Sequence, residues 1–388
     1  MRIPVVNAAP ARPAPHLYFV NPLVDFACIG GASVLTFAAL ALVYRAGAVS
    51  APWVFTAAAL LTWVCNYPHF AATNYRLYQS KQNVSQYPLT AFVVPPLIVA
   101  GMAASFALPD LVAPYFVKLF LLWSGYHYSG QSVGITCVYA RRAGFAVGRL
   151  ERLALSGFVF GTYLLAVARS ESGAGALNYY GISYPTLRLP QFVTVMAGHW
   201  VWMCGLVFLL LVVNWCVANR RVLPPIVLLP AGAQLLWFVV GAGDANFNAF
   251  VPFFHSLQYL LIAWSLHLKE RMDTGGVEPS RGFVARESLR WGAVIVAVGA
   301  FLFWMLPHTL ASSTGLGFQI AAPIVLAGVQ IHHFFVDGVI WKLKNPKVSS
   351  PLLVNIGQLV RPASATAMTK GLPAGLPVEA AQPAQQAA

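Results

Sequence analysis

Nine histidines occur in the sequence, and five of them lie inside long apolar runs. An ionisable side chain at such a depth is costly to bury, so it points to a function. Imidazole is a good ligand for iron, zinc and copper. The five residues are His69, His127, His255, His332 and His333. Several imidazoles gathered at one depth of a membrane would form a metal site shielded from water, with either His332 or His333 as the fourth ligand.

Polar side chains accompany these histidines at helical spacing. Residues three or four apart share a helix face, and a metal-bound imidazole usually donates its second N–H to a nearby acceptor. Asp337 follows His333 by four residues and His332 by five. Because it is a carboxylate well inside an apolar run, Asp337 is the best candidate for orienting a ligand. The other companions are Asn66, Thr73, Gln131, Gln258 and Tyr259.

Three of these companions are also predicted to act on bound oxygen. Gln131 follows His127 by four residues, and Gln258 and Tyr259 follow His255 by three and four. Their amide or phenol groups can donate a hydrogen bond to an oxygen atom at the centre. Together with Asp337 they form the predicted catalytic set.

The elements that must position these residues are membrane-spanning helices. A span needs about 20 mostly apolar residues, and the sequence offers ten such segments. They are 23–44, 53–75, 88–108, 114–140, 150–169, 191–217, 222–241, 246–268, 289–306 and 317–341. The predicted fold is therefore an all-α, polytopic membrane bundle, with a cytoplasmic arm over 1–22 and a transmembrane domain over 23–345. Residues 346–388, rich in Ala, Pro and Gln, are predicted to be disordered.

The positive charges support this map. Lysine and arginine accumulate on the cytoplasmic side of membrane proteins. Of the 24 lysines and arginines, all but four fall in segments that the ten-span arrangement places on the cytoplasmic side. The exceptions are Arg45, Lys118, Arg169 and Arg188. The bias predicts cytoplasmic N and C termini. The chain is therefore expected to be a multi-pass protein of the inner (cytoplasmic) membrane.

The composition agrees with this assignment. The chain is 58% hydrophobic and only 9% charged, whereas soluble domains are about 25% charged. Its net charge of +13 is explained by topology, so no nucleic-acid partner is expected. The five cysteines form no C-x-x-C pair, which argues against a disulfide framework or a thiolate cluster. Membrane lipids and a lipid-soluble small molecule are the expected partners, and no protein partner is indicated.

The histidine-bearing spans run in the same direction. With the N-terminus inside, the second, fourth, eighth and tenth spans all cross from outside to inside. A rise of about 1.5 Å per residue places their histidines about 10 to 21 Å above the inner boundary. Four parallel helices could therefore direct imidazoles to one point within the membrane.

The order of these motifs resembles that of the bacterial Brp/Blh family of membrane β-carotene dioxygenases. That family has P-H, then H-F-G, then F-x-H-S, then a histidine with an aspartate four or five residues on. This chain has Pro68-His69, His127-Tyr128, Phe254-His255-Ser256, and His332-His333 with Asp337. Thr73 and Ser129 stand where the family has Asp and Gly. The resemblance implies an all-helical membrane protein whose four histidines hold one iron.

Three functions are compatible with these patterns. The first is an oxygenase, a dioxygenase by the resemblance, with non-haem Fe(II) or zinc and a carotenoid-, isoprenoid- or fatty-chain-like substrate. The second is a b-type haem protein, because paired histidines on neighbouring helices can ligate haem. The third is a transporter or channel, in which the histidines and Asp337 form a polar path.

Overall fold

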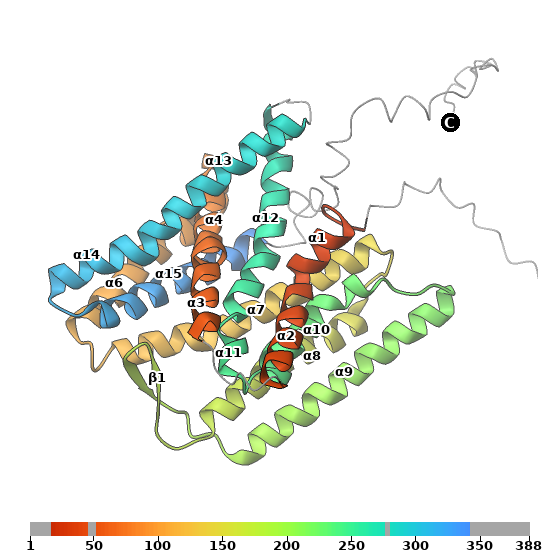
Figure 1. The fold of residues 1–388 in the computed structure, drawn as a ribbon, viewed down its shortest axis with the longest axis horizontal. Coiled ribbons are helices and arrows are strands. Elements are labelled where there is room, and N and C mark those ends of the chain that lie inside the picture. Colours follow the sequence, from red (N-terminus) through yellow and green to blue (C-terminus); the bar gives the residue numbers. More distant parts are fainter. Residues whose placement is uncertain (1–16, 46–51, 276–279, 342–388) are drawn as a thin grey trace, which may run out of the picture.

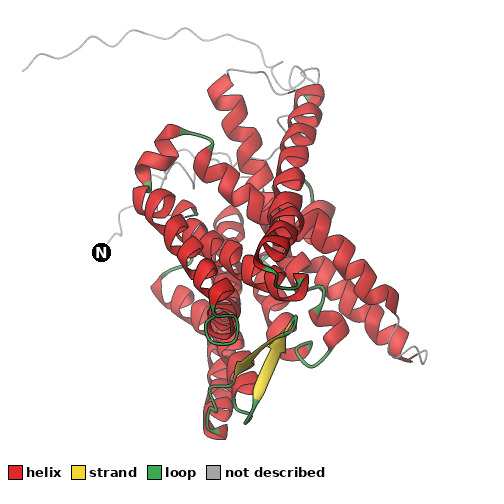
Figure 2. Ribbon diagram, turned by 90° about the vertical axis from the view of Figure 1, so that its left-hand side faces the viewer, coloured by secondary structure: helices red, strands yellow, loops and turns green. Residues whose placement is uncertain are grey.

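The computed structural model describes residues 17–45, 52–275 and 280–341. Most of these residues are helical, and the single sheet among them is a two-stranded hairpin (Figures 1 and 2). The expected tail over 346–388 and most of the expected arm over 1–22 lie outside the described residues.

In the described residues most helical elements join into ten rods, each of which overlaps one of the predicted spans. In chain order the elements are α1 (Pro22–Phe26), η1 (Ala27–Gly31), α2 (Ala32–Arg45), α3 (Pro52–Leu61), η2 (Thr62–Asn66), α4 (Tyr67–Tyr78), α5 (Lys81–Gln86), η3 (Leu89–Val93), α6 (Val94–Ala107), α7 (Ala113–Arg142), α8 (Arg149–Glu171), β1 (Ala176–Tyr179), β2 (Ile182–Pro185), α9 (Gln191–Asn219), η4 (Pro225–Val227), α10 (Leu229–Leu235), η5 (Leu236–Val240), α11 (Ala245–Asn248), α12 (Val251–Gly275), α13 (Arg281–Ala300), η6 (Phe301–Met305), α14 (Leu306–Thr314) and α15 (Phe318–Ile340).

Seven rods are long and apolar enough to cross a membrane. Large apolar side chains on the rods face outward, including Leu60, Leu97 and Trp202, each more than 60% exposed. A surface of this kind is stable in lipid and not in water. The prediction of an all-α membrane bundle is thus confirmed for the described residues, with seven rods that could cross a membrane.

The other three rods fall short of that criterion for physical reasons. The rod of α3, η2 and α4 and the rod of α7 carry the polar residues around His69 and His127, which lower their hydropathy. The rod of α10 and η5 is apolar but short, since its apolar helix covers only Leu229–Val240.

Prolines account for three of the five π-helical turns in the described residues. The turns η2, η3 and η6 each end two residues before a proline, namely Pro68, Pro95 and Pro307. A proline inside a helix lacks an N–H, and its ring collides with the carbonyl four residues earlier. That carbonyl lies within the π-helical turn in each case. The wider turn relieves the collision and lets the rod continue.

Four rods meet at the centre of the bundle. In Figure 1, α7 and α15 pass behind α4 and α12. Helix α15 packs against α7 and α4, and α12 packs against η2 and α4. Helices α8 and α9 form a long pair on one side, and α13 packs against α4 on the other. The four central helices are the even-numbered predicted spans that carry the deep histidines.

The hairpin closes one end of the bundle. Strands β1 and β2 pair antiparallel, with Ala176 opposite Pro185 and Tyr179 opposite Ile182. The two turn residues, Tyr180 and Gly181, have φ of 48° and 92°, as a type I′ turn requires. The sequence segment between the fifth and sixth predicted spans is thus an ordered loop, which the ten-helix prediction did not include.

Candidate metal centre

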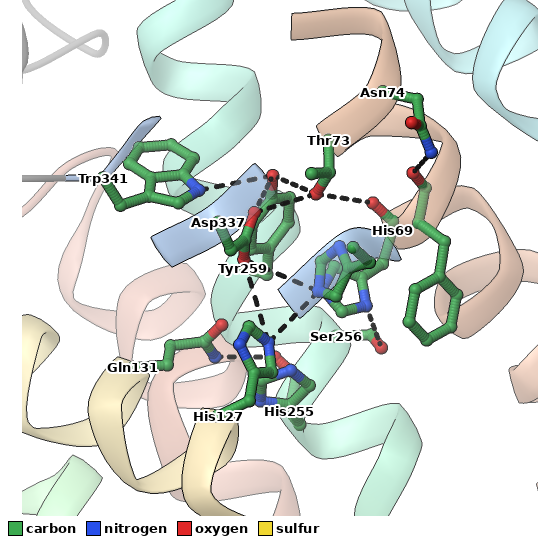
Figure 3. A network of polar contacts seen from close by, with 12 residues as sticks. His69, Thr73, Asn74, His127, Gln131, His255, Ser256, Tyr259, Asp337 and Trp341 are labelled. Atoms are coloured by element: carbon green, nitrogen blue, oxygen red, sulfur yellow. Dashed lines mark hydrogen bonds and ion pairs between the residues drawn. The ribbon is translucent and has the colours of Figure 1, made fainter. Parts of the chain in front are cut away.

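Four imidazoles converge at one point inside the bundle (Figure 3). His69 of α4, His127 of α7, His255 of α12 and His333 of α15 each offer a nitrogen, and these nitrogens all lie within 4.8 Å of one another. His127 Nε2 and His333 Nε2 are 3.1 Å apart. The ring of His69 lies 4.4 Å from that of His333 and 5.0 Å from that of His255. The structure therefore brings together four of the five histidines chosen from the sequence.

The geometry fits a single metal ion. Two imidazole nitrogens at about 2.0–2.1 Å from a tetrahedral metal lie about 3.3 Å apart, close to the observed 3.1 Å. His69 Nε2 and both nitrogens of His255 are buried and have no hydrogen-bond partner among the described residues. Leaving a buried nitrogen unpaired is costly. A cation bound between the four rings would satisfy His69 Nε2 and one nitrogen of His255.

His332 lies outside this group. It occupies the same helix as His333, but successive residues on a helix point about 100° apart. Its Nε2 is also buried without a partner in the described part of the chain. Of the two adjacent histidines left open by the sequence, only His333 faces the other three.

Asp337 connects two of the histidines to a polar network. Its Oδ2 lies 3.5 Å from His333 Nε2 and 3.7 Å from His127 Nε2. Its Oδ1 accepts hydrogen bonds from Thr73 Oγ1 at 3.1 Å and from the Tyr259 hydroxyl at 3.4 Å. Asp337 is 8% exposed, so its charge acts in a region of low dielectric constant. It stands beside the two Nε2 atoms, where its charge can attract a cation at the centre.

Tyr259 is bound to the same network. Its hydroxyl lies 2.5 Å from Thr73 Oγ1 and accepts from Trp341 Nε1 at 3.4 Å. Figure 3 shows Tyr259 beside Asp337. These contacts hold the phenol at the edge of the site.

A serine hydroxyl contacts the ring of His69 at its other nitrogen, Nδ1. The Ser256 hydroxyl lies 3.3 Å from His69 Nδ1, 2.8 Å from Asn66 Oδ1 and 2.7 Å from the Pro252 carbonyl. When this hydroxyl donates to the carbonyl of Pro252, it can accept from the Nδ1–H of His69. That tautomer leaves the lone pair of His69 Nε2 free for a metal.

The two glutamines differ from each other in their surroundings. Gln131 Nε2 donates to the His255 carbonyl at 3.0 Å and to Gln258 Oε1 at 3.2 Å, while Gln131 Oε1 is buried without a partner in the described residues. Gln258 Nε2 donates to the Ile29 carbonyl at 2.5 Å. That carbonyl lies in η1, where the helical dihedrals break at Gly30. Gln258 is thus held on both sides and secures α12 to the first rod.

Sequence reasoning missed two residues of the site. Ser256 is adjacent to His255 in sequence but serves His69 on another helix, so no spacing rule within one helix could find it. Tyr128 stacks on His255, with ring centroids 3.8 Å apart and planes 15° apart. The only signal for Tyr128 was that it flanks His127.

An apolar cavity of about 280 Å³ opens onto the cluster. His127, Gln131, Tyr259 and Asp337 form its polar end. The rest is apolar and includes Trp123, Tyr126, Phe160, Phe334 and Trp341. Tyr126 and Gly130, near the middle of α7, and Gly338, near the end of α15, line the cavity and are exposed. A molecule dissolved in lipid can therefore reach the histidines from the side.

Comparison of the whole chain with protein-family models, with curated proteins and with solved structures finds no match.

Proposed function

We propose that this protein is a membrane-embedded, histidine-ligated metal oxygenase that acts on a lipid-soluble substrate. The observation that carries the proposal is the convergence of four imidazoles beside an apolar cavity that opens on the outside of the bundle. His69, His127, His255 and His333 would hold the metal. A carotenoid, an isoprenoid or a fatty chain could enter through the cavity without crossing water.

The donor set and the resemblance together favour non-haem Fe(II). All-imidazole sites suit iron, zinc and copper, and the family that the motifs resemble uses iron. A bound iron would supply activation of O2. Ser256 would orient His69, Asp337 would attract the cation, and Gln131 Oε1 would accept a hydrogen bond from a group at the centre.

The test is a metal and oxygen assay on protein purified in detergent. We expect about one iron per chain by mass spectrometry. We also expect O2 consumption that depends on a carotene, a polyprenol or an unsaturated fatty acid. Zinc at the same stoichiometry, with no O2 consumption, would keep the metal site and reject the oxygenase. A preparation without any stoichiometric metal would reject both.

Substitution of Gly134 tests the cavity as the substrate path. A Cβ placed on Gly134 meets no atom within 4 Å, and Gly134 lines the cavity, so the side chain of Gly134→Leu is expected to occupy cavity space. Metal content is expected to stay at the wild-type level while O2 consumption falls at least tenfold, because the substrate no longer fits. Gly198→Leu on α9 is the matched control, since its Cβ also meets no atom within 4 Å. Equal activity of the two variants would contradict this path.

Asp337→Asn tests whether the charge of the carboxylate helps to bind the metal. Asparagine keeps the size and one acceptor oxygen, so the bonds from Thr73 and Tyr259 can remain. Loss of the charge is expected to weaken metal binding about 10- to 100-fold, as for other partners of metal ligands. Competition with a calibrated chelator measures the affinity. An unchanged affinity would show that Asp337 does not act on the metal.

The spacing of the rings argues against haem. Two axial nitrogens on opposite sides of a haem iron lie about 4 Å apart, twice a metal–nitrogen distance of about 2 Å, with the porphyrin between them. Here His127 Nε2 and His333 Nε2 lie 3.1 Å apart, and two more imidazoles adjoin them. A purified protein without a Soret band is the expected result.

We also propose the full topology of ten crossings, with both termini on the cytoplasmic side of the inner membrane. The ten helical rods and the asymmetry of the basic residues support it. Tyr180→Cys is expected to react with an impermeant maleimide added to the outer face, and Arg220→Cys only after the membrane is opened. The reverse pattern would invert the orientation.

A further inference from the structure

A second and larger cavity lies between the histidine cluster and the hairpin. Its volume is about 740 Å³, within the range of small-molecule sites. We call it the hairpin cavity. It is lined by η2, α7, α12, η6, α15 and the turn of the hairpin, and its walls include Trp63, Tyr67, Tyr179, Phe303, Trp304 and Gln330.

Aromatic rings form the walls of the hairpin cavity. Tyr67 and Phe303 stack with centroids 4.4 Å apart and planes 9° apart, and Trp63 meets Tyr67 edge-on at 5.1 Å. Trp304 lies 5.6 Å from Trp63 and 5.8 Å from Phe318. Aromatic rings pair best with other flat rings, in stacked or edge-to-face arrangements. The walls therefore suit a flat ligand.

Polar groups in the hairpin cavity are neutral. Its described lining residues include no lysine, arginine, histidine, aspartate or glutamate. A phosphate or carboxylate group would lose its hydration there without gaining a partner charge. The occupant is therefore uncharged.

Gln330 is a buried polar residue of the lining whose side chain has no hydrogen-bond partner in the described residues. It is 6% exposed. Its amide is therefore available to a molecule that enters the cavity. An oxygen atom on the ligand would accept a hydrogen bond from the amide nitrogen of Gln330.

We propose that the hairpin cavity binds a neutral, lipid-soluble flat ring that carries a carbonyl or hydroxyl oxygen, as quinones do. The site is distinct from the apolar cavity at His127. The two sites lie close together, because Tyr128 lines the hairpin cavity while its ring stacks on His255. A ligand there would lie one side chain away from the histidine cluster.

The probe is 2-methyl-1,4-naphthoquinone, which quenches tryptophan fluorescence, added to the full-length protein in detergent. We expect saturable quenching that is reduced in the Trp63→Phe/Trp304→Phe double variant. The oxygen-free 2-methylnaphthalene has the same shape and should displace the quinone at least fivefold less well. Gln330→Leu should remove this preference, and Gln191→Leu at the exposed start of α9 should keep it.

Three results would overturn the proposal. Quenching that rises without saturation would show partition into detergent only. If Gln330→Leu still prefers the quinone to 2-methylnaphthalene, the amide of Gln330 does not bind the ligand. Displacement by tetramethylammonium better than by 2-methylnaphthalene would assign the rings to a cation. The metal content of the same preparations distinguishes the two proposals. Quinone binding by a protein without metal would contradict the oxygenase and would still support this site.

Discussion

Replacing any one of the four clustered histidines by alanine is expected to reduce the amount of metal bound per chain at least tenfold. Each ring supplies one of four nitrogens that lie within 4.8 Å of one another, and three ligands hold a metal less tightly than four. The variants are His69→Ala, His127→Ala, His255→Ala and His333→Ala. Metal per chain, measured by mass spectrometry after purification, gives the result.

His332→Ala is the matched control for this series. His332 is the neighbour of His333 on α15, is also largely buried, and does not belong to the cluster. It should retain wild-type metal. Equal losses in His332→Ala and His333→Ala would show a general effect of disturbing α15. Glutamine variants at the same positions keep more of the side-chain volume. If such a variant loses metal while its gel-filtration profile is unchanged, the cause is the loss of the imidazole ligand.

Lys118→Met is expected to destabilise the bundle by about 3–5 kcal/mol, the usual cost of breaking a buried ion pair from one side. Lys118 Nζ lies 2.8 Å from Glu171 Oε2 and also donates to the Pro185 carbonyl. Both side chains are less than 10% exposed. The variant leaves the Glu171 carboxylate buried with the Leu187 N–H as its remaining partner. Thermal unfolding in detergent should show a clearly lower midpoint.

Two further variants define the origin of that loss. Lys118→Met combined with Glu171→Gln removes both charges and should recover much of the stability. Lys269→Met breaks an exposed pair with Asp273, four residues away on one helix, and should cost under about 1 kcal/mol. If the two single variants lose the same stability, burial of the Lys118 pair has no energetic role.

Apolar runs were sufficient to predict the rods, because a span is defined by its own length and composition. The π-helical turns were within reach of the sequence, since three of them follow from prolines at a constant offset. The hairpin was harder to predict. Its strands have four residues each, and its turn places the non-glycine residue Tyr180 at positive φ.

The convergence of histidines from four helices was predictable, because parallel spans carry them at similar depths. The sequence left His332 and His333 open as the fourth ligand, and the structure selects His333, which also lies beside Asp337. Individual polar contacts between helices were not predictable. Gln258 was expected to face bound oxygen, but the break at Gly30 exposes the Ile29 carbonyl, and Gln258 donates to it. Which partner a polar side chain meets depends on packing that no single segment encodes.

The distribution of the ligands along the chain sets an order for biogenesis. Helix α15 comes last among the described helices, and it carries both His333 and Asp337. A nascent chain that ends before Phe318 has three of the clustered histidines and lacks both His333 and the carboxylate of Asp337. The complete cluster therefore forms only after the last rod has been inserted and docked. Truncated or stalled chains would lack the full ligand set, which separates finished protein from its precursors.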